Sequence, residues 1–347
     1  MPGADEKVIN WHRIQHRMTA IVYHDDFTLH DNPYHPERAE RLVSVMEYLR
    51  SMPFFDRLAQ MQPEMVSEDL LLEVHTPDMV SRVKNAQGWL DPDTYVSRDS
   101  YRIARLAAGG VVGACQAVLR GEQDSVFALV RPPGHHATRD TSMGFCLFNN
   151  AAVAAQSLAK QGQRVLIFDH DVHHGNGTAD IFYERRDILY QSFHLYPHFP
   201  GTGLVDEIGA GEGAGYTVNA PLSRGTGNAG VRQVMEEVML PIARQFDPHV
   251  VIVSAGFDSH HTDTLGGLYL TVDFYGDIIS RLLEVQEKMV CSLEGGYNTD
   301  VLRKGVAVEV ATLLHTPVSC EDRVEDERGA GDVVQALRDT LGSYWSL

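Results

Sequence analysis

The feature that most constrains the fold of this chain is a set of short apolar runs in which hydrophobic and polar residues do not alternate. Two of the clearest read VVIVSAGFD (250–258) and RVLIFDHD (164–171). A strand with one solvated face would alternate, whereas a strand buried on both faces reads as a continuous apolar run. These runs therefore predict a mainly parallel sheet that is covered by helices on both faces.

Strands of this kind alternate with amphipathic helical stretches as far as about residue 315. Strands are expected at Ala20–His24, Ser125–Val130, Arg164–Asp169, Ile188–Phe193, Val250–Ser254 and Met289–Leu293. Helices are expected at Pro36–Arg50, Tyr101–Arg120, Asn150–Lys160, Gly230–Gln245, Val272–Glu287 and Asp300–Leu314. This alternation predicts one α/β domain with a mainly parallel central sheet.

The two ends of the chain differ from this central part. Residues 1–17 precede the first strand-like run and are expected to be an extension, and residues 18–315 are expected to form a single domain. Residues 316–347 form an acidic tail with a short helix expected at Asp332–Trp345. The sequence leaves open whether that helix docks on the domain or frays.

Composition excludes some partners and favours one compartment. The formal net charge of −18 argues against nucleic acid, because phosphate binding needs clustered Lys and Arg. No stretch has the roughly 18 apolar residues of a membrane helix, and the first residues lack a secretory core, so no membrane partner is expected. The four cysteines show no CxxC spacing, which favours reduced thiols and a cytoplasmic location. A homo-oligomer stays open.

Side chains that carry chemistry follow four of the expected strands. The segments are RPPGHHAT with His135 and His136, DHDVHHGNGT with Asp169, Asp171 and His173, AGFDSHHTD with Asp258, and EGGYN with Tyr297. Taken singly, each has a plain structural interpretation, since paired histidines often lie in turns and an Asp after a strand is often a helix N-cap. In open α/β sheets, however, ligands bind beyond the carboxyl ends of the strands. The four segments together therefore predict a site at that edge.

The spacing of the acidic and imidazole groups indicates a metal. Asp171 and His173 are two residues apart in an extended segment, so both can face one ion, and Asp258 can supply a third ligand. Crowding such groups in one turn is unfavourable unless a cation is bound there. Three N/O ligands with an open position are typical of catalytic zinc, although iron or manganese also accepts this donor set.

The remaining groups suit metal-assisted amide hydrolysis. A histidine of the tandem pair can accept a proton from water and later protonate the leaving amine. Tyr297 can donate its hydroxyl proton to the developing oxyanion, and Gly295 and Gly296 allow the backbone to approach closely before it. No GxSxG elbow or phosphate-binding GxxxxGK[ST] loop offers a rival chemistry.

The motifs RPPGHHA, GFCLFNN, DHDVHHGNGT, FPGTG, AGFDSH and LEGGYN, together with HPERAERL (35–42), resemble those of the zinc-dependent histone deacetylases. The resemblance spans about residues 20–315. Asn176 and Glu294 make the chain similar to class II enzymes and to bacterial histone deacetylase-like amidohydrolases, within the arginase/deacetylase superfamily. The resemblance implies a three-layer α/β/α fold with the active site at the carboxyl ends of the strands, and a deacetylase catalytic domain over residues 18–315.

The resemblance also implies roles for individual residues. One zinc ion per chain would be held by Asp171, His173 and Asp258, with His136 as proton shuttle, His135 as its electrostatic partner and Tyr297 polarising the carbonyl. Asp169 would orient His135, and Asn176 would be a neutral partner of His136. The acyl-lysine tunnel maps to Gly144, Phe145 and Phe199, and a rim aspartate to Asp93. A structural potassium ion maps to Asp169, Asp171, His173, Ser192 and Phe193.

The substrate remains divided between an acetylated lysine side chain in a peptide or protein and a small acetylated amine such as an acetylpolyamine. Polyamine-selective relatives place a Glu at the tunnel mouth, seven residues after the last zinc ligand, where this chain has Leu265. That difference favours acetyl-lysine. A non-catalytic acyl-lysine-binding scaffold and a binuclear hydrolase are more remote, because His136, Asp258 and Tyr297 are all present and only Asp263 could serve a second metal.

Overall fold

The computed structural model describes residues 18–324 and 328–347, so the expected extension at residues 1–17 lies outside the described residues. Its core is an eight-stranded sheet in the order β2-β1-β5-β10-β9-β6-β7-β8, and every pairing between neighbours is parallel. The strands are β1 (Thr19–Val22), β2 (Ala59–Met61), β5 (Ser125–Ala128), β6 (Val165–Asp169), β7 (Ile188–Leu195), β8 (Thr217–Leu222), β9 (Val250–Ala255) and β10 (Met289–Leu293). A small antiparallel pair, β3 (Gly88–Trp89) and β4 (Tyr95–Val96), lies apart from this sheet.

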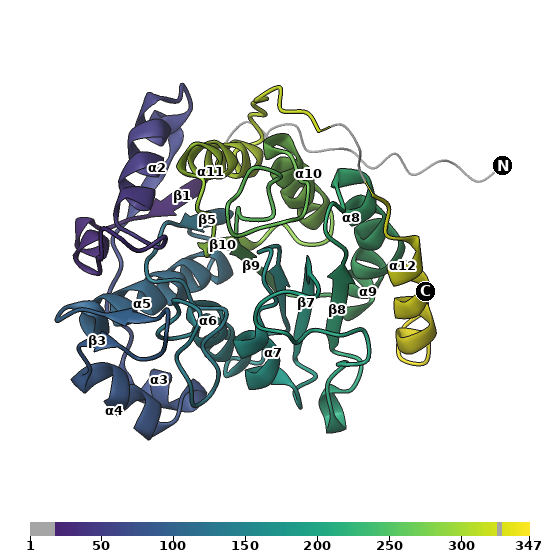
Figure 1. Cartoon of the computed structure of the whole chain (residues 1–347), viewed down its shortest axis with the longest axis horizontal. Helices are drawn as coiled ribbons and strands as arrows, with labels where there is room; N and C mark the ends of the chain where they lie inside the picture. Colours follow the sequence, from purple (N-terminus) through teal and green to yellow (C-terminus); the bar gives the residue numbers. More distant parts are fainter. Residues whose placement is uncertain (1–17, 325–327) are drawn as a thin grey trace.

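Helices cover both faces of the sheet and give the expected three layers (Figure 1). On one face α2 (Glu40–Ser51), α10 (Val272–Leu283) and α11 (Thr299–Leu313) pack side by side. On the other face α5 (Ser100–Leu119) packs against α6 (Asn150–Ala159). The shorter helices are α3 (Glu68–Val74), α4 (Pro77–Asn85), α7 (Asn176–Phe182), α8 (Asn228–Val234), α9 (Leu240–Phe246) and α12 (Gly331–Leu341). The central strands are buried along their whole length, as their continuous apolar sequences predict.

All six expected strands are present, with ends that shift by no more than two residues, but β2 and β8 were not expected. Both are edge strands of the sheet. Strand β8 reads TVNAPL, and its proline is tolerated because an edge strand need not donate every ladder hydrogen bond. The single helix expected at Gly230–Gln245 is instead α8, a π-helical turn at Met235–Met239 and α9, which has Pro241 in its first turn. The helix expected from Pro36 begins at Glu40.

The C-terminal tail docks on the domain. Helix α12 buries Val334, Leu337 and Leu341 and packs beside α8 and the β8 edge (Figure 1). The indole Nε1 of Trp345 donates a hydrogen bond of 2.7 Å to the carbonyl oxygen of Gly215. Of the two alternatives that the sequence left open for this helix, the structure shows docking.

Contrary to the expectation that no stretch would have the apolar length of a membrane helix, one described helix, α5, is long and apolar enough by length and composition. Two-thirds of its apolar window (67%) is buried inside the domain, where it packs on α6 and on the sheet. It is therefore the core helix of the second layer.

The buried carboxylate of Glu37, just before α2, links α2 to the loop that follows β5. Glu37 accepts hydrogen bonds from Arg131 Nη2 at 2.8 Å and from Arg41 Nη1 at 3.0 Å, and all three side chains are buried. Burial alone would raise the pKa of Glu37, but Arg131 and Arg41 outweigh it and hold the pKa at about 2. Because the folded-state pKa lies below the ordinary glutamate value of 4.5, this stabilisation is fully present above pH 4.5 and is lost as the pH falls towards 2.

Glu37→Gln is expected to lower the free energy of unfolding at pH 7 by about 3 kcal/mol, because it leaves two buried guanidinium groups without a full counter-charge. Urea unfolding followed by circular dichroism measures this loss. Glu40→Gln, which changes an exposed carboxylate three residues further on, at the start of α2, is the control and should cost about 0–1 kcal/mol. Equal effects of the two substitutions would contradict the assignment.

Candidate active site

The side chains singled out in the sequence come from four neighbouring strands at the centre of the sheet. Strands β5, β10, β9 and β6 are consecutive, and each is followed by one of the four polar segments. Because these strands are parallel, their carboxyl ends share one edge of the sheet. The predicted residues therefore meet there, as the topology rule requires.

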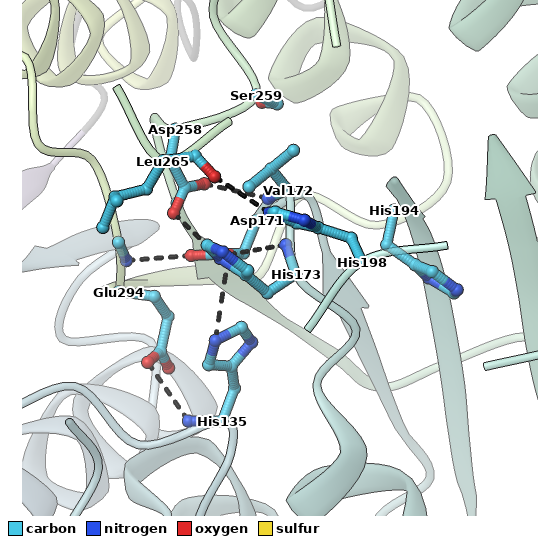
Figure 2. Close-up of polar contacts among 12 residues, drawn as sticks. His135, Asp171, Val172, His173, His194, His198, Asp258, Ser259, Leu265 and Glu294 are labelled. Atoms are coloured by element: carbon cyan, nitrogen blue, oxygen red, sulfur yellow. Dashed lines mark hydrogen bonds and ion pairs between the residues drawn. The ribbon is translucent and has the colours of Figure 1, made fainter. Parts of the chain in front are cut away.

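Asp171, His173 and Asp258 form a cluster that could hold a metal ion, with ligand atoms all within 4.8 Å of one another. Figure 2 shows the three side chains pointing toward one another. The imidazole Nδ1 of His173 lies 3.0 Å from Asp171 Oδ1 and 3.3 Å from Asp258 Oδ2. Both carboxylates are fully buried.

Backbone donors fix the outer oxygens of this cluster. Val172 N donates to Asp258 Oδ1 at 2.8 Å, and Gly295 N donates to Asp171 Oδ2 at 2.9 Å. Among the described residues, the buried Asp258 Oδ2 accepts no hydrogen bond of good geometry, and its ion-pair contact is with His173 Nδ1 at 3.3 Å. A buried carboxylate oxygen of this kind is costly unless a cation binds it, so the donor set fits a metal.

Gly295, two residues before Tyr297, makes room for the two carboxylates. A Cβ at Gly295 would lie 2.2 Å from Asp258 Oδ2 and 2.5 Å from Asp171 Oδ2, and one at Gly256 would lie 2.1 Å from Asp171 Oδ2. No real side chain tolerates such distances. The predicted need for close backbone approach thus applies to Gly295, and the carboxylate cluster is its cause.

Protonation in the cluster follows from its charges. Burial opposes a charge on His173, but Asp171 and Asp258 outweigh burial and raise its pKa to about 10. Burial and the neighbouring Asp171 raise the pKa of Asp258 to about 6. The site thus places two carboxylates so close together that, without a cation, one of them ionises with difficulty.

The tandem histidines lie beside this cluster with different partners. His135 Nδ1 lies 3.0 Å from Asp169 Oδ2, and His136 Nδ1 lies 2.8 Å from Asn176 Oδ1. The ring centroids of the two histidines are 4.0 Å apart. Both partners are oxygens that accept, so each imidazole carries its proton on Nδ1, and Nε2 of His136 is free to act as a base.

The charges of the two histidines also differ. Burial opposes a charge on His135, but Asp169 and Asp171 raise its pKa to about 10. Burial, followed by the charge on His135, lowers the pKa of His136 well below its usual value. These pKa shifts favour a charge on His135 and a neutral imidazole at His136.

A cavity of about 240 Å³ leads to these groups. It is lined by Asp93, His136, Gly144, Phe145, His173, His198, Phe199, Leu265 and Tyr297. All five predicted substrate-contacting positions are in this set, as are His136, His173 and Tyr297. The structure thus brings together every residue expected in the tunnel.

The aromatic rings give the cavity its shape. Phe145 stands edge-on to Tyr297, with ring centroids 5.7 Å apart, and Phe199 stands edge-on to His136 at 5.1 Å. Gly144 is required between them, because it has a positive φ of 54° and a Cβ there would lie 2.6 Å from His136 Cδ2. The walls can therefore enclose a narrow apolar stem.

Two of the positions expected for potassium, Asp171 and His173, belong to the metal cluster, and the other three lie on β6 and β7. Asp169 at the end of β6 pairs in register with Ser192 on β7, and Phe193 follows it as a buried residue. Asp169 Oδ1 accepts a hydrogen bond of 3.2 Å from Asp171 N. Asp263, considered for a second metal, instead accepts hydrogen bonds from Tyr297 N and Asn298 N at 2.7 and 2.8 Å.

Arg41, Glu294 and His198 were not predicted as site residues from the sequence. Arg41 donates to Gly296 O at 2.8 Å and to Glu294 O at 2.7 Å, so it holds the backbone that carries Tyr297. Glu294 Oε2 accepts from Gly134 N at 2.6 Å, which fixes the histidine loop.

His198 lies beside His173 in Figure 2, nearly parallel to it with ring centroids 4.9 Å apart. Its Nε2 donates to the carbonyl oxygen of Leu265 at 2.9 Å and so joins the two loops of the mouth. In the sequence, only its position directly before Phe199 indicated that His198 would lie at the cavity.

The fold and this site define a parallel α/β domain with a cluster that could hold a metal ion beside a cavity with aromatic walls. A family model described as histone deacetylase domain matches residues 35–313. A probable deacetylase of Archaeoglobus fulgidus is 41% identical over 295 residues, which cover 82% of each chain. The chain belongs to the histone deacetylase family, which confirms the resemblance seen in the motifs.

Two further relatives extend this result. Polyamine deacetylase HDAC10 of Homo sapiens is 38% identical over 353 residues, 94% of this chain but 53% of that protein. Among solved structures, the HDA15 HD domain matches with a TM-score of 0.89 and 35% identity, covering 95% of both chains. The arginase/deacetylase-like fold expected from the sequence is thereby confirmed.

Proposed function

We propose that this protein is a zinc-dependent deacetylase that hydrolyses the acetyl amide of N-ε-acetyl-lysine in peptides or proteins. One observation carries the proposal. His136 and Tyr297 face the cluster of Asp171, His173 and Asp258 at the base of a cavity with aromatic walls. That arrangement combines a metal site, a base and an acid around one reacting bond.

Asp171, His173 and Asp258 would hold the zinc ion, which suits their mixture of nitrogen and carboxylate donors. When bound, zinc supplies Lewis acidity, which polarises a carbonyl and lowers the pKa of water. Carbonyl and carboxylate oxygens around Asp169, Ser192 and Phe193 would hold a potassium ion.

His136 is the residue that moves the proton. Its Nδ1–H is held by Asn176 Oδ1, so the unprotonated Nε2 can accept a proton from the attacking water and deliver it to the leaving amine. The low pKa of His136 keeps it neutral at physiological pH. The charge on His135 contributes to this and favours negative charge in the transition state.

Tyr297 is the residue that stabilises the carbonyl oxygen. Burial, with Asp258 nearby, raises the pKa of Tyr297 well above its usual value, so its hydroxyl stays protonated and can donate a hydrogen bond. Arg41 lies 5.1 Å from its ring and bonds to the preceding carbonyl, which keeps the loop in place. A donor fixed before the reaction favours the transition state over the ground state.

The cavity supports lysine as the carrier of the acyl group. Phe145 and Phe199 would enclose the methylene stem, and Asp93 would accept hydrogen bonds from the substrate backbone at the rim. The similarity to a polyamine deacetylase favours a second candidate, a small acetylated amine. Leu265 in the cavity wall gives no negative charge for a distal ammonium group.

The experiment that tests the proposal compares kcat/KM of zinc-loaded protein on an acetyl-lysine peptide and on an acetylated polyamine. We expect the peptide to be preferred by at least about tenfold, or about 1.4 kcal/mol, since only the peptide has a backbone that Asp93 can bind at the rim. A preference for the polyamine would favour a small acetylated amine as the substrate in place of acetyl-lysine. Absence of hydrolysis of both would refute the proposed activity.

Leu265→Glu is expected to shift this preference toward the polyamine. The new carboxylate would lie at the mouth of the cavity and attract a distal ammonium group, which lysine in a peptide does not have. The ratio of the two kcat/KM values should move by about 10–100-fold, with Leu265→Gln as the uncharged control. An unchanged ratio in the Glu variant would show that this position does not select the substrate.

A further inference from the structure

Asp322 belongs to the C-terminal tail, beyond the residues 35–313 that the family model matches. Its carboxylate nevertheless contacts the loop that follows the third candidate metal ligand. Oδ2 lies 2.6 Å from His260 Nε2, Oδ1 lies 3.3 Å from His261 Nε2, and Val272 N donates to Oδ2 at 3.0 Å. The tail is thus tied to residues only two and three positions after Asp258.

The same loop holds the backbone of Tyr297. Asp263 Oδ2 accepts hydrogen bonds from Tyr297 N at 2.7 Å and from Asn298 N at 2.8 Å. Asn298 Nδ2 donates to Thr262 Oγ1 at 2.9 Å. Leu265, two residues after Asp263, lines the cavity. The loop therefore links Asp322 on one side to both Tyr297 and the cavity wall on the other.

His260, His261 and Asp322 also have ligand atoms within 4.8 Å of one another, so a metal there must be considered. Thr262 N donates to His260 Nδ1 at 3.1 Å, which leaves the proton of the neutral imidazole on Nε2. In this tautomer Nε2 donates to Asp322. We call this hydrogen-bonded group of His260, His261 and Asp322 the clasp.

Further contacts secure the tail beside the clasp. Cys320 N and Ser319 Oγ both donate to Asp273 at 2.8 Å, and Arg57 Nη1 donates to Thr316 Oγ1 at 2.6 Å. The segment that precedes Asp322 is thus hydrogen-bonded to α10 and to a residue near β2. These contacts, all shortly before Asp322 in the chain, hold the segment that carries it, and a segment held in this way can keep a loop in one conformation.

We propose that Asp322 is a positioning residue of the active site. It holds the loop of residues 260–265 through His260 and His261, and this loop in turn fixes the backbone of Tyr297 through Asp263. The proposal rests on the proposed function for the role of the Tyr297 hydroxyl. It gives the C-terminal tail a part in catalysis in addition to its packing on the domain.

Hydrogen–deuterium exchange of the whole protein tests the positioning without requiring activity. Asp322→Ala should accelerate exchange at least about tenfold in peptides covering 260–265 and 296–299, because opening of the loop would cost about 1.4 kcal/mol less. Exchange in α6, on the opposite layer, should not change. Glu321→Gln removes a charge from the exposed neighbouring residue and should leave both peptides at wild-type rates.

Unchanged exchange in both peptides would overturn the proposal, as would acceleration throughout the protein. If Asp322→Ala does not fold, Asp322→Asn removes the charge while keeping the shape, and the same comparison applies. Wild-type protein that hydrolyses neither substrate would refute the proposed function, while the exchange result would still decide the positioning.

Kinetics provide a second readout in the active enzyme. Asp322→Ala should lower kcat about tenfold with KM within about twofold and zinc content unchanged, because misplacement of a catalytic group acts on the transition state. In a Tyr297→Phe background the same substitution should have little further effect, since the hydroxyl to be positioned is absent. Equal losses in both backgrounds would show a merely structural role and contradict the proposal.

Discussion

Tyr297→Phe is expected to lower kcat on an acetyl-lysine peptide by about 10²–10³-fold while zinc content and KM stay near wild-type values. The substitution removes one hydrogen-bond donor to the developing oxyanion and little else, and such a donor contributes about 3–4 kcal/mol to the transition state. Phe keeps the ring that stands edge-on to Phe145, so the cavity wall is preserved. Steady-state kinetics with metal analysis of the same sample measure both quantities.

The matched control is Tyr344→Phe, which removes a hydroxyl from a half-exposed tyrosine in the C-terminal segment. It should leave kcat within about twofold of wild type. If Tyr297→Phe kept full activity, the hydroxyl would have no catalytic part. A loss of zinc in that variant would instead assign Tyr297 to the stability of the metal site.

Asp258→Ala is expected to abolish zinc binding and with it all measurable turnover. The substitution removes one of three candidate ligands, and it also removes the acceptor for Val172 N. Zinc content after dialysis should fall from about one ion per chain to below about 0.1, since two ligands cannot hold a catalytic zinc ion tightly.

Asp258→Asn separates the two effects, because an amide oxygen can still accept from Val172 N. We expect this variant to fold like the wild type and also to lack zinc. Asp206→Ala, at an exposed acid, controls for a change of net charge. A fully metallated Asp258→Ala protein would show that the third ligand is misassigned.

The strands that position the site could be predicted because burial on both faces leaves a direct trace in the sequence. Residues 250–253 and 165–168 are apolar without interruption, and the strands β9 and β6 that they form are neighbours at the centre of the sheet. Strand β8 could not be found in the same way, since Asn219 and Pro221 interrupt its apolar pattern at the sheet edge. Its presence depends on pairing with β7.

The candidate site was predictable to the extent that its residues directly follow strands. His136, Asp171, Asp258 and Tyr297 meet because parallel strands share one carboxyl edge. Arg41 belongs to a motif noted in the sequence, but its bonds to the loop before Tyr297 link residues about 255 positions apart. Contacts of this kind depend on the packed structure, which a local pattern does not encode.

The central claim is that one zinc ion in this site supports deacetylation, and a zinc titration of metal-stripped protein tests it most directly. Acetate release from an acetyl-lysine peptide is followed while zinc is added in known equivalents. The account predicts no turnover in the stripped protein, a linear rise, and a plateau at about one equivalent per chain. Full turnover in the stripped protein, or no turnover at any zinc concentration, would contradict it.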